Sequence, residues 1–349
     1  MDYKKNEGVV FMAVAFNEVN LVGRLNRLDI REGLSKAGAE FVVATFTLQI
    51  NDSQIRVENF AMKLNKSGDL TGGYKAINTL FEEANALHKT IKVVNAEKAE
   101  EIINDTIVEN IDECTAIKFS NFGSFKYCRL EENVYVNKEG ELVRNIRITG
   151  AYPNRVDEEK VEYVPKADWE ISGVVLDVPR IKADEEGNES MLVKIMFPTY
   201  QEEWQDRPAS VVLNEITVES RDVESFEYIE DNFTKGSIVY LNGEIIRKVE
   251  RIEMESVMED DNRGFGRKLE KKPIYRTKID EYYSLLGGWI LEEEEIEMTP
   301  ALSMDLWSKA KEDKKEKEEQ MLEDNKKPIQ KSFGRGETKQ TKKGGVLPF

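Results

Sequence analysis

Alternation of apolar and polar residues constrains the fold of this chain more than any other feature. In residues 40–50, EFVVATFTLQI, one face at period two carries Val42, Ala44, Phe46, Leu48 and Ile50. This period is that of a β-strand with one face in a core. Residues 17–30 and 54–64 show similar strand patterns, and short polar turns separate the three runs. The sequence therefore predicts an opening three-stranded meander.

A helical periodicity follows the meander. Apolar residues recur at steps of three and four, which predicts an amphipathic helix over residues 74–88. Its apolar face would consist of Ile77, Leu80, Phe81, Ala84 and Leu87. A more polar helical stretch is expected near residues 96–103. The tetrapeptide NKEG, residues 137–140, lies between two alternating runs and indicates a β-hairpin.

The same order of elements returns in the second half of the chain. Residues 167–181 repeat the apolar pattern around a glycine, and Gly173 follows Gly23 by 150 residues. Three strands, a helix and two strands are predicted in each half, which is the layout of a five-stranded oligonucleotide-binding (OB) barrel. The fold class is therefore mainly β with α elements. Two tandem OB barrels are expected at residues 17–155, with an insertion near 92–115, and at residues 167–258.

The C-terminal part has a different composition. Residues 259–298 form a connecting segment that is basic and then acidic, and residues 263–278 hold seven basic side chains and one acidic one. A charged helix is expected over residues 299–325, with Thr299 as its cap and Pro300 in its first turn. Residues 326–349 have the composition of a disordered tail, which ends in Pro-Phe.

Composition limits the classes of function. The chain has 349 residues, a net charge of −17, two cysteines and one histidine. These residues supply neither a disulfide framework nor a structural zinc site, and no glycine-rich phosphate loop is present. No apolar run is long enough to cross a membrane. We therefore expect a cytoplasmic protein that is not an enzyme and needs no metal or cofactor.

Several strand motifs resemble those of bacterial and phage single-stranded DNA-binding proteins. The residues that match are Asn20, Leu21, Val22, Gly23, Arg24 and Leu25 in the first strand, Val43, Ala44, Phe46 and Leu48 in the second, and Arg56, Val57, Phe60 and Leu64 in the third. KGSIVYLNGEI, residues 235–245, resembles the family's fourth strand, and Pro348-Phe349 resembles its tail tip. Several features depart from the family. Its third-strand tryptophan is missing near Gln54, and the first half lacks the Lys-Gly-Ser strand and has an insertion near residues 92–115. Residues 300–349 are net basic, with 12 basic and 9 acidic side chains.

The resemblance implies a divergent, phage-encoded protein acting in the host cytoplasm. It would coat and protect single-stranded DNA in replication, recombination or repair. A tail ending in Leu347, Pro348 and Phe349 would recruit replication or recombination proteins. The sequence leaves a homo-oligomer open. The alternative is an OB-fold scaffold of a virion or replisome that does not bind nucleic acid, which the acidic composition favours.

Such a barrel holds single strands by stacking bases on aromatic rings and by placing cations beside phosphates. The candidate residues are Arg24, Arg27, Arg31, Lys36, Arg56, Phe60, Phe122, Phe125, Tyr127, Arg129, Arg144 and Arg147. A secondary track would consist of Arg263, Phe265, Arg267, Lys268 and Tyr275. Phe60 corresponds to the family's stacking position.

Each candidate also has a structural interpretation. Phe60 and the aromatics of residues 118–130, KFSNFGSFKYCRL, could instead fill the core of the first barrel. The arginines could be ordinary solvated surface charges, and residues 263–278 could be a charged linker.

Overall fold

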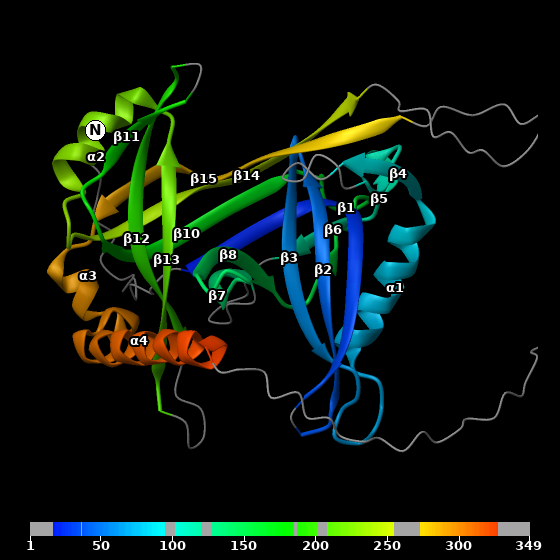
Figure 1. Ribbon diagram of the computed structural model, residues 1–349, viewed down its shortest axis with the longest axis horizontal. Helices are drawn as coiled ribbons and strands as arrows, with labels where there is room; N and C mark the ends of the chain where they lie inside the picture. The colour runs from blue at the N-terminus through cyan, green and yellow to red at the C-terminus, as the bar shows by residue number, and fades with distance from the viewer. Residues whose placement is uncertain are drawn as a thin grey trace, which may run out of the picture.

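The computed structural model describes residues 17–35, 37–94, 102–119, 128–184, 187–201, 208–254 and 273–326. Within these ranges the protein is mainly β, with two OB-like barrels and a helical C-terminal region. In Figure 1 the first barrel lies on the right with its helix outside, and the second lies on the left. The predicted fold class is therefore confirmed.

The first barrel is a meander closed by later strands. Its elements are β1 (Asn17–Leu34), β2 (Glu40–Ile50), β3 (Ser53–Met62), α1 (Gly72–Ala86), β4 (His88–Val94), β5 (Ile102–Val108), β6 (Ala116–Phe119), β7 (Cys128–Val136), β8 (Leu142–Gly150) and β9 (Asn154–Arg155). Strand β6 pairs with β1, and β8 pairs with β7 and runs parallel to β3. The five residues of the predicted β2 core face are all buried, as is most of the predicted face of α1.

The second barrel repeats this order. Its elements are β10 (Lys166–Val175), β11 (Arg180–Ala183), β12 (Glu189–Gln201), β13 (Ser210–Ser220), α2 (Phe226–Asn232), β14 (Ile238–Met254), β15 (Ile274–Ile290), α3 (Glu293–Glu297) and α4 (Met304–Lys326). Strand β10 pairs with both β12 and β14, and β15 closes the ring against β14 and β13. Beyond the barrel, β14 and β15 extend as a long arm toward the first barrel (Figure 1).

The structure differs from the sequence-based expectation in three places. Residues 102–108, the start of which was expected to be helical, form β5, which pairs with β4 because that hairpin continues the sheet beside β15. Strand β15 closes the second barrel, although its residues fall in the expected connecting segment 259–298. The helix expected from residue 299 begins as a 3-10 turn, Pro300–Leu302, and α4 starts only at Met304.

The first strands of the two barrels pair with each other. Strands β1 and β10 run antiparallel, with Asn17 opposite Ile171 and Leu21 opposite Ala167. Since equivalent positions differ by 150 residues, these two pairs exchange under a local two-fold rotation. Its axis passes beside Val19 and Trp169, which face each other and are both 0% exposed. One chain therefore reproduces the pairing of a symmetric dimer.

A buried polar junction reinforces this pairing. The side-chain amide of Asn17 donates to the carbonyl of Leu130 at 3.0 Å and to Thr199 at 2.9 Å. Its oxygen accepts from the N–H of Leu130, and Asn214 accepts from the N–H of Glu132. Strand β7 pairs with β8 along one edge, and on its other edge side chains of both barrels accept from the N–H groups of Leu130 and Glu132 in place of a second strand.

Two equivalent glycines allow the close approach of strands inside each barrel. A Cβ on Gly23 would lie 2.6 Å from a side-chain carbon of Ile50, and one on Gly173 would lie 2.3 Å from the backbone oxygen of Met196. The space beside each glycine is therefore taken up by the neighbouring strand, which explains the repeated glycine of the sequence.

We expect Gly173→Ala to destabilise the protein by about 1–3 kcal/mol, because the added methyl meets backbone that cannot move aside. Urea unfolding followed by circular dichroism measures this change. Gly72→Ala is the matched control, since a Cβ at Gly72 meets nothing within 4 Å. Equal stability of the two variants would contradict the packing argument.

Candidate nucleic-acid interface

The outward face of β2 and β3 carries the most exposed aromatic side chain of the first barrel's meander. Phe60 is 60% exposed, so it does not fill the core. Its ring lies 5.2 Å from that of Phe41, centroid to centroid, with the planes tilted by 36°. The core alternative for Phe60 is therefore wrong: the alternation of β3 buries Ile55 and Val57 and directs Phe60 outward.

Backbone register sets the neighbours of this aromatic pair. Arg31, Val43 and Phe60 form one row across β1, β2 and β3. In the next row Phe41 faces Gly33, where a Cβ would lie only 2.5 Å from the end of the ring. Gly33 thus leaves room for the ring of Phe41 to lie over β1, beside Phe60.

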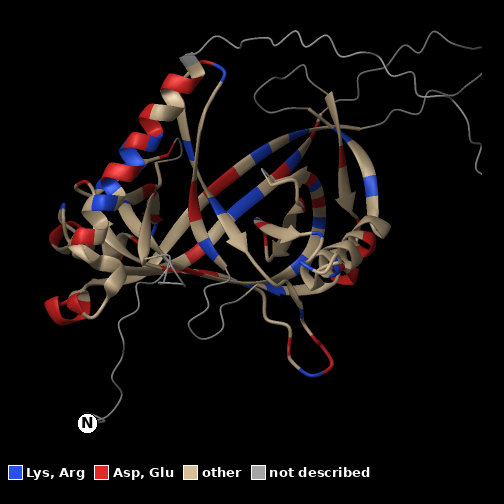
Figure 2. Cartoon of the chain, turned by 90° about the horizontal axis from the view of Figure 1, so that it is seen from below, with Lys and Arg blue, Asp and Glu red and all other residues tan. Residues whose placement is uncertain are grey.

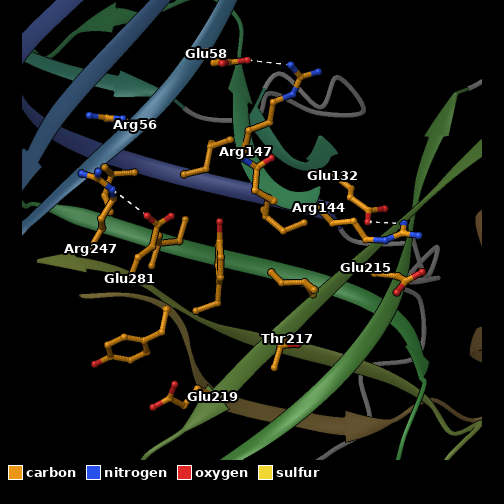
Figure 3. A pocket seen from close by; sticks show the side chains of 18 of the residues that line it. Arg56, Glu58, Glu132, Arg144, Arg147, Glu215, Thr217, Glu219, Arg247 and Glu281 are labelled. Carbon is orange, nitrogen blue, oxygen red and sulfur yellow. Dashed lines mark hydrogen bonds and ion pairs between the residues drawn. The ribbon is translucent and has the colours of Figure 1, made fainter. Parts of the chain in front are cut away.

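A cleft between the barrels adjoins this face. Its main hollow has a volume of 890 Å³ and is lined by Thr45 and Arg56 of the first barrel and by Lys194 and Thr217 of the second. Figure 3 shows Arg56 and Arg147 on one side of this hollow and Glu215 and Thr217 on the other. The outward faces of β2–β3 and β12–β13 therefore face each other across the cleft.

A second hollow of 670 Å³ continues beneath the β14–β15 arm. It shares Lys182, Glu219, Glu281 and Tyr282 with the main hollow. The two hollows differ in charge. The lining of the main hollow holds seven basic and five acidic side chains, whereas that of the second holds four basic and six acidic ones. An anionic ligand is therefore favoured only in the main hollow.

The guanidinium of Arg24 is engaged in hydrogen bonds within the protein. Its guanidinium donates to both carboxylate oxygens of Glu158, at 2.6 and 2.7 Å, and to the carbonyl of Cys114 at 3.1 Å. It also lies 4.4 Å from the ring centroid of Tyr163. These contacts fix the segment between the two barrels against the first barrel, so Arg24 is not open to a ligand.

Four further candidate arginines also have carboxylate partners. The pairs are Arg27 with Asp29 and Asp105, Arg129 with Glu131, Arg144 with Glu132 and Glu318, and Arg147 with Glu58 and Glu131. Their positive charge is largely balanced where they stand. The structure therefore does not bring the predicted arginines together as one track of open cations.

Arg31 and Arg56 are the exceptions among the candidates that the structure describes, because neither has a carboxylate partner there. Both are exposed. Although its side chain remains exposed, the walls of the cleft partly desolvate Arg56 and lower its pKa below the usual value, and the nearby charges of Arg247 and Arg27 lower it further. A pKa lowered by like charges marks a place where an anion would be stabilised.

The remaining candidates divide into two groups. Tyr275 lies on β15, opposite Glu253, and lines neither hollow. Outside the described residues lie Lys36, Phe122, Phe125, Tyr127, Arg263, Phe265, Arg267, Lys268, Leu347, Pro348 and Phe349.

Sequence reasoning missed two residues of this region. Phe41 lies on the face of β2 opposite the predicted core face, so the alternation of residues 40–50 already contained the signal for its outward position. Arg247 is only 7% exposed and reaches the cleft from β14. No local pattern indicates it, because its position depends on the pairing of the arm with the first barrel.

Helix α4 packs on the second barrel beside the cleft. Trp307 and Ala310 pack on Val211 and Leu213 of β13. Farther along, Lys314 bonds Glu132 of the first barrel at 2.7 Å and Glu215 of the second at 3.0 Å. Figure 2 shows the mixed charges along this helix. The helix thus covers part of the β13 face and links the two barrels.

Among the described residues we find neither a candidate metal site nor a candidate transmembrane helix. The part of the chain that the structure describes holds no cluster of three or more metal-ligating His, Cys, Asp or Glu side chains. Its helices are also too short or too polar for a transmembrane segment.

Comparisons with known proteins give one family match and several structural likenesses. A family model described as YorF matches residues 128–340, more than half of the chain. None of the curated proteins matches. The chain is similar to the wild-type single-stranded DNA binding protein from Thermus aquaticus, with 11% identity, a TM-score of 0.41 and coverage of 80% of this chain and 95% of that chain.

Two further solved structures match the chain with lower TM-scores. A deletion mutant of the Thermus aquaticus protein has 12% identity and a TM-score of 0.39, and the match covers 80% of this chain and 97% of that chain. The Plasmodium falciparum SSB complex with ssDNA has 13% identity and a TM-score of 0.24, covering 36% of this chain and 94% of that chain.

The link through α4 should weaken in acid. Partial burial acts to raise the pKa of Glu215, but the bonds from Lys314 and Lys194 outweigh it and leave this pKa below the usual value. Glu215 therefore stabilises the fold above the unfolded-state pKa of about 4.3, and this contribution is lost as the pH falls through the folded-state pKa.

We expect the unfolding free energy of Glu215→Gln to fall less on acidification than that of the unaltered protein, as measured by urea unfolding across the acid range. Glu297→Gln is the control, because Glu297 is exposed on α3. Parallel pH profiles for the unaltered protein and Glu215→Gln would contradict the role given to Glu215.

Proposed function

The chain belongs to the YorF family, and we propose that it binds single-stranded DNA on the outward face of its first barrel. The observation that carries the proposal is the outward pair of the exposed Phe60 and the half-buried Phe41, flanked by Arg31 and Arg56, two cations without a carboxylate partner among the described residues. The face formed by strands 2 and 3 is the one with which OB folds bind oligonucleotides.

The geometry favours stacking without sequence recognition. A base can lie on the exposed ring of Phe60, while Phe41 supports that ring from the side. Stacking is worth roughly 1–3 kcal/mol per base and accepts any base, because every base has a π-face. Arg31 lies in the same row as Phe60, and Arg56 lies four residues away along β3, so each can meet a phosphate beside the stack.

The same arrangement favours a single strand over a duplex. Bases in a duplex are stacked on one another, so their faces are not open to Phe60. A protein of net charge −17 also offers no broad basic surface for the duplex backbone. Under this proposal the protein coats single strands that arise in replication, recombination or repair.

Recruitment of other proteins is the finer part of the proposal. The terminal residues Leu347, Pro348 and Phe349 would dock on a replication or recombination protein. The support for this role is the sequence resemblance of the tail tip, together with an apolar end on a polar segment.

One observation favours the alternative of a scaffold without nucleic-acid binding. Carboxylates neutralise Arg24, Arg27, Arg129, Arg144 and Arg147. The two proposals differ in one measurement, the anisotropy of a labelled oligo-dT compared with a duplex of the same length over a salt series. Binding to oligo-dT that weakens with salt supports the strand-binding function, whereas no binding at low salt rejects it in favour of the scaffold.

We expect Phe60→Ala to weaken oligo-dT binding by roughly fivefold to 150-fold, which corresponds to the loss of one stacked base. Tyr228→Ala is the matched control, since Tyr228 is also exposed and paired with a ring, Phe233, but lies on α2. Unaltered binding by Phe60→Ala would remove the stacking site from this face.

A further inference from the structure

Arg56 and Arg247 bring two guanidinium groups from different barrels to one wall of the main hollow. Arg56 extends from β3 of the first barrel, and Arg247 from β14 of the second. Figure 3 shows the two side chains beside each other, with Glu281 bonded to Arg247. Two like charges so placed repel each other, and an anion between them would relieve the repulsion.

The position of Arg247 is fixed by three hydrogen bonds. Its Nε donates to Glu281 at 3.0 Å, its Nη1 to the carbonyl of Gln54 at 3.0 Å, and its backbone N–H to Ser53 at 3.2 Å. Its Nη2 donates to no residue that the structure describes. The guanidinium of Arg247 is therefore fixed in place, and its Nη2 group can still donate a hydrogen bond to a ligand. The exposed side chain of Arg56 beside it can change its conformation to meet the same ligand.

The second barrel offers little surface for stacking bases in this hollow. The outward residues of β13 there are Glu215, Thr217 and Glu219, none of which is aromatic. Tyr282 of β15 also lines this hollow, but the guanidinium of Arg221 lies 3.7 Å from its ring centroid and already occupies one face of the ring. Helix α4 covers the neighbouring part of β13. The main contribution of the second barrel to a bound strand is therefore charge, and Arg247 lies next to the open cation of the first barrel, Arg56.

We infer that a phosphate of the bound strand lies between Arg56 and Arg247, so that both barrels hold the same strand. The inference rests on the proposed function and extends it: the first barrel stacks the bases, and the second supplies a phosphate contact. Because the lining of the second hollow is net acidic, the strand ends its contacts in the main hollow.

Glu281 then competes with the phosphate for Arg247. Its carboxylate is 43% exposed and lines the same hollow. Removing this negative charge weakens the electrostatic hold on Arg247 and lowers the repulsion on the strand. If the strand did not enter the main hollow, loss of this ion pair would bring no gain in affinity, so a tighter complex places a phosphate near Glu281 and Arg247.

The experiment compares oligo-dT binding over a salt series for Arg56→Gln, for Glu281→Gln and for Glu227→Gln, a charge-matched control on α2. We expect Arg56→Gln to lower the magnitude of the log–log salt slope by about 0.7, the value for one phosphate contact on a single strand. We expect Glu281→Gln to tighten binding by roughly fivefold, and Glu227→Gln to bind as the unaltered protein does.

The double variant Arg56→Gln/Glu281→Gln tests whether the two residues act on one phosphate. If they do, the changes in binding free energy of the two single substitutions do not add up to the change in the double variant. Arg56 is exposed, so its substitution tests the site without a folding defect. An unchanged slope in Arg56→Gln, or no tightening in Glu281→Gln, overturns the inference while Phe60-dependent binding stands. Absence of oligo-dT binding by the unaltered protein would instead reject the proposed function.

Discussion

The antiparallel pairing of β1 with β10 is the constraint on which the rest of the structure depends. It joins the first strands of the two barrels and places Val19 against Trp169 on the local two-fold axis. The amide of Asn17 then bonds Leu130 and Thr199 across the junction. With the barrels fixed in this way, their outward β2–β3 and β12–β13 faces line one cleft. A change at the junction would thus alter the cleft without touching any residue that lines it.

The two barrels share a fold but present different surfaces. In the first, Phe60 lies exposed on the outward face beside the half-buried Phe41. In the second, α4 packs Trp307 on the equivalent side, and Glu215 and Glu219 face the cleft. The symmetry that relates the backbones therefore does not extend to the side chains. One barrel can specialise in stacking while the other positions charge and supports the cleft.

Local patterns predicted the elements whose residues alternate or recur without interruption. The core face of β2, the apolar face of α1 and the repeated order of elements follow from spacing alone. Strand β15 was not recognised, because its glycines and charged residues hide the alternation and its partners, β14 and β13, precede it in sequence. The strand β5 was likewise hidden, since its pairing with β4 supplies what its polar composition does not.

The candidate site was predictable in its aromatic part and not in its electrostatic part. The outward positions of Phe41 on β2 and Phe60 on β3 each follow from the two-residue alternation within their own strand. Whether an arginine is open to a ligand depends in several cases on carboxylates far away in sequence, such as Glu318 for Arg144 and Asp105 for Arg27. Arg247 reaches the first barrel through a bond to Gln54, 193 residues away. A single sequence does not contain the register between barrels that decides such contacts.

The net charge of −17 is compatible with a strand-binding site, because most of it acts at a distance. Charges separated by more than about 8 Å are largely screened at physiological ionic strength. Within that distance a phosphate beside Arg56 meets Arg247 and the net positive lining of the main hollow. At low salt the repulsion from the acidic body reaches farther and opposes the local attraction. The salt dependence of binding is therefore set by the few open cations of the site, moderated by the charge of the whole molecule.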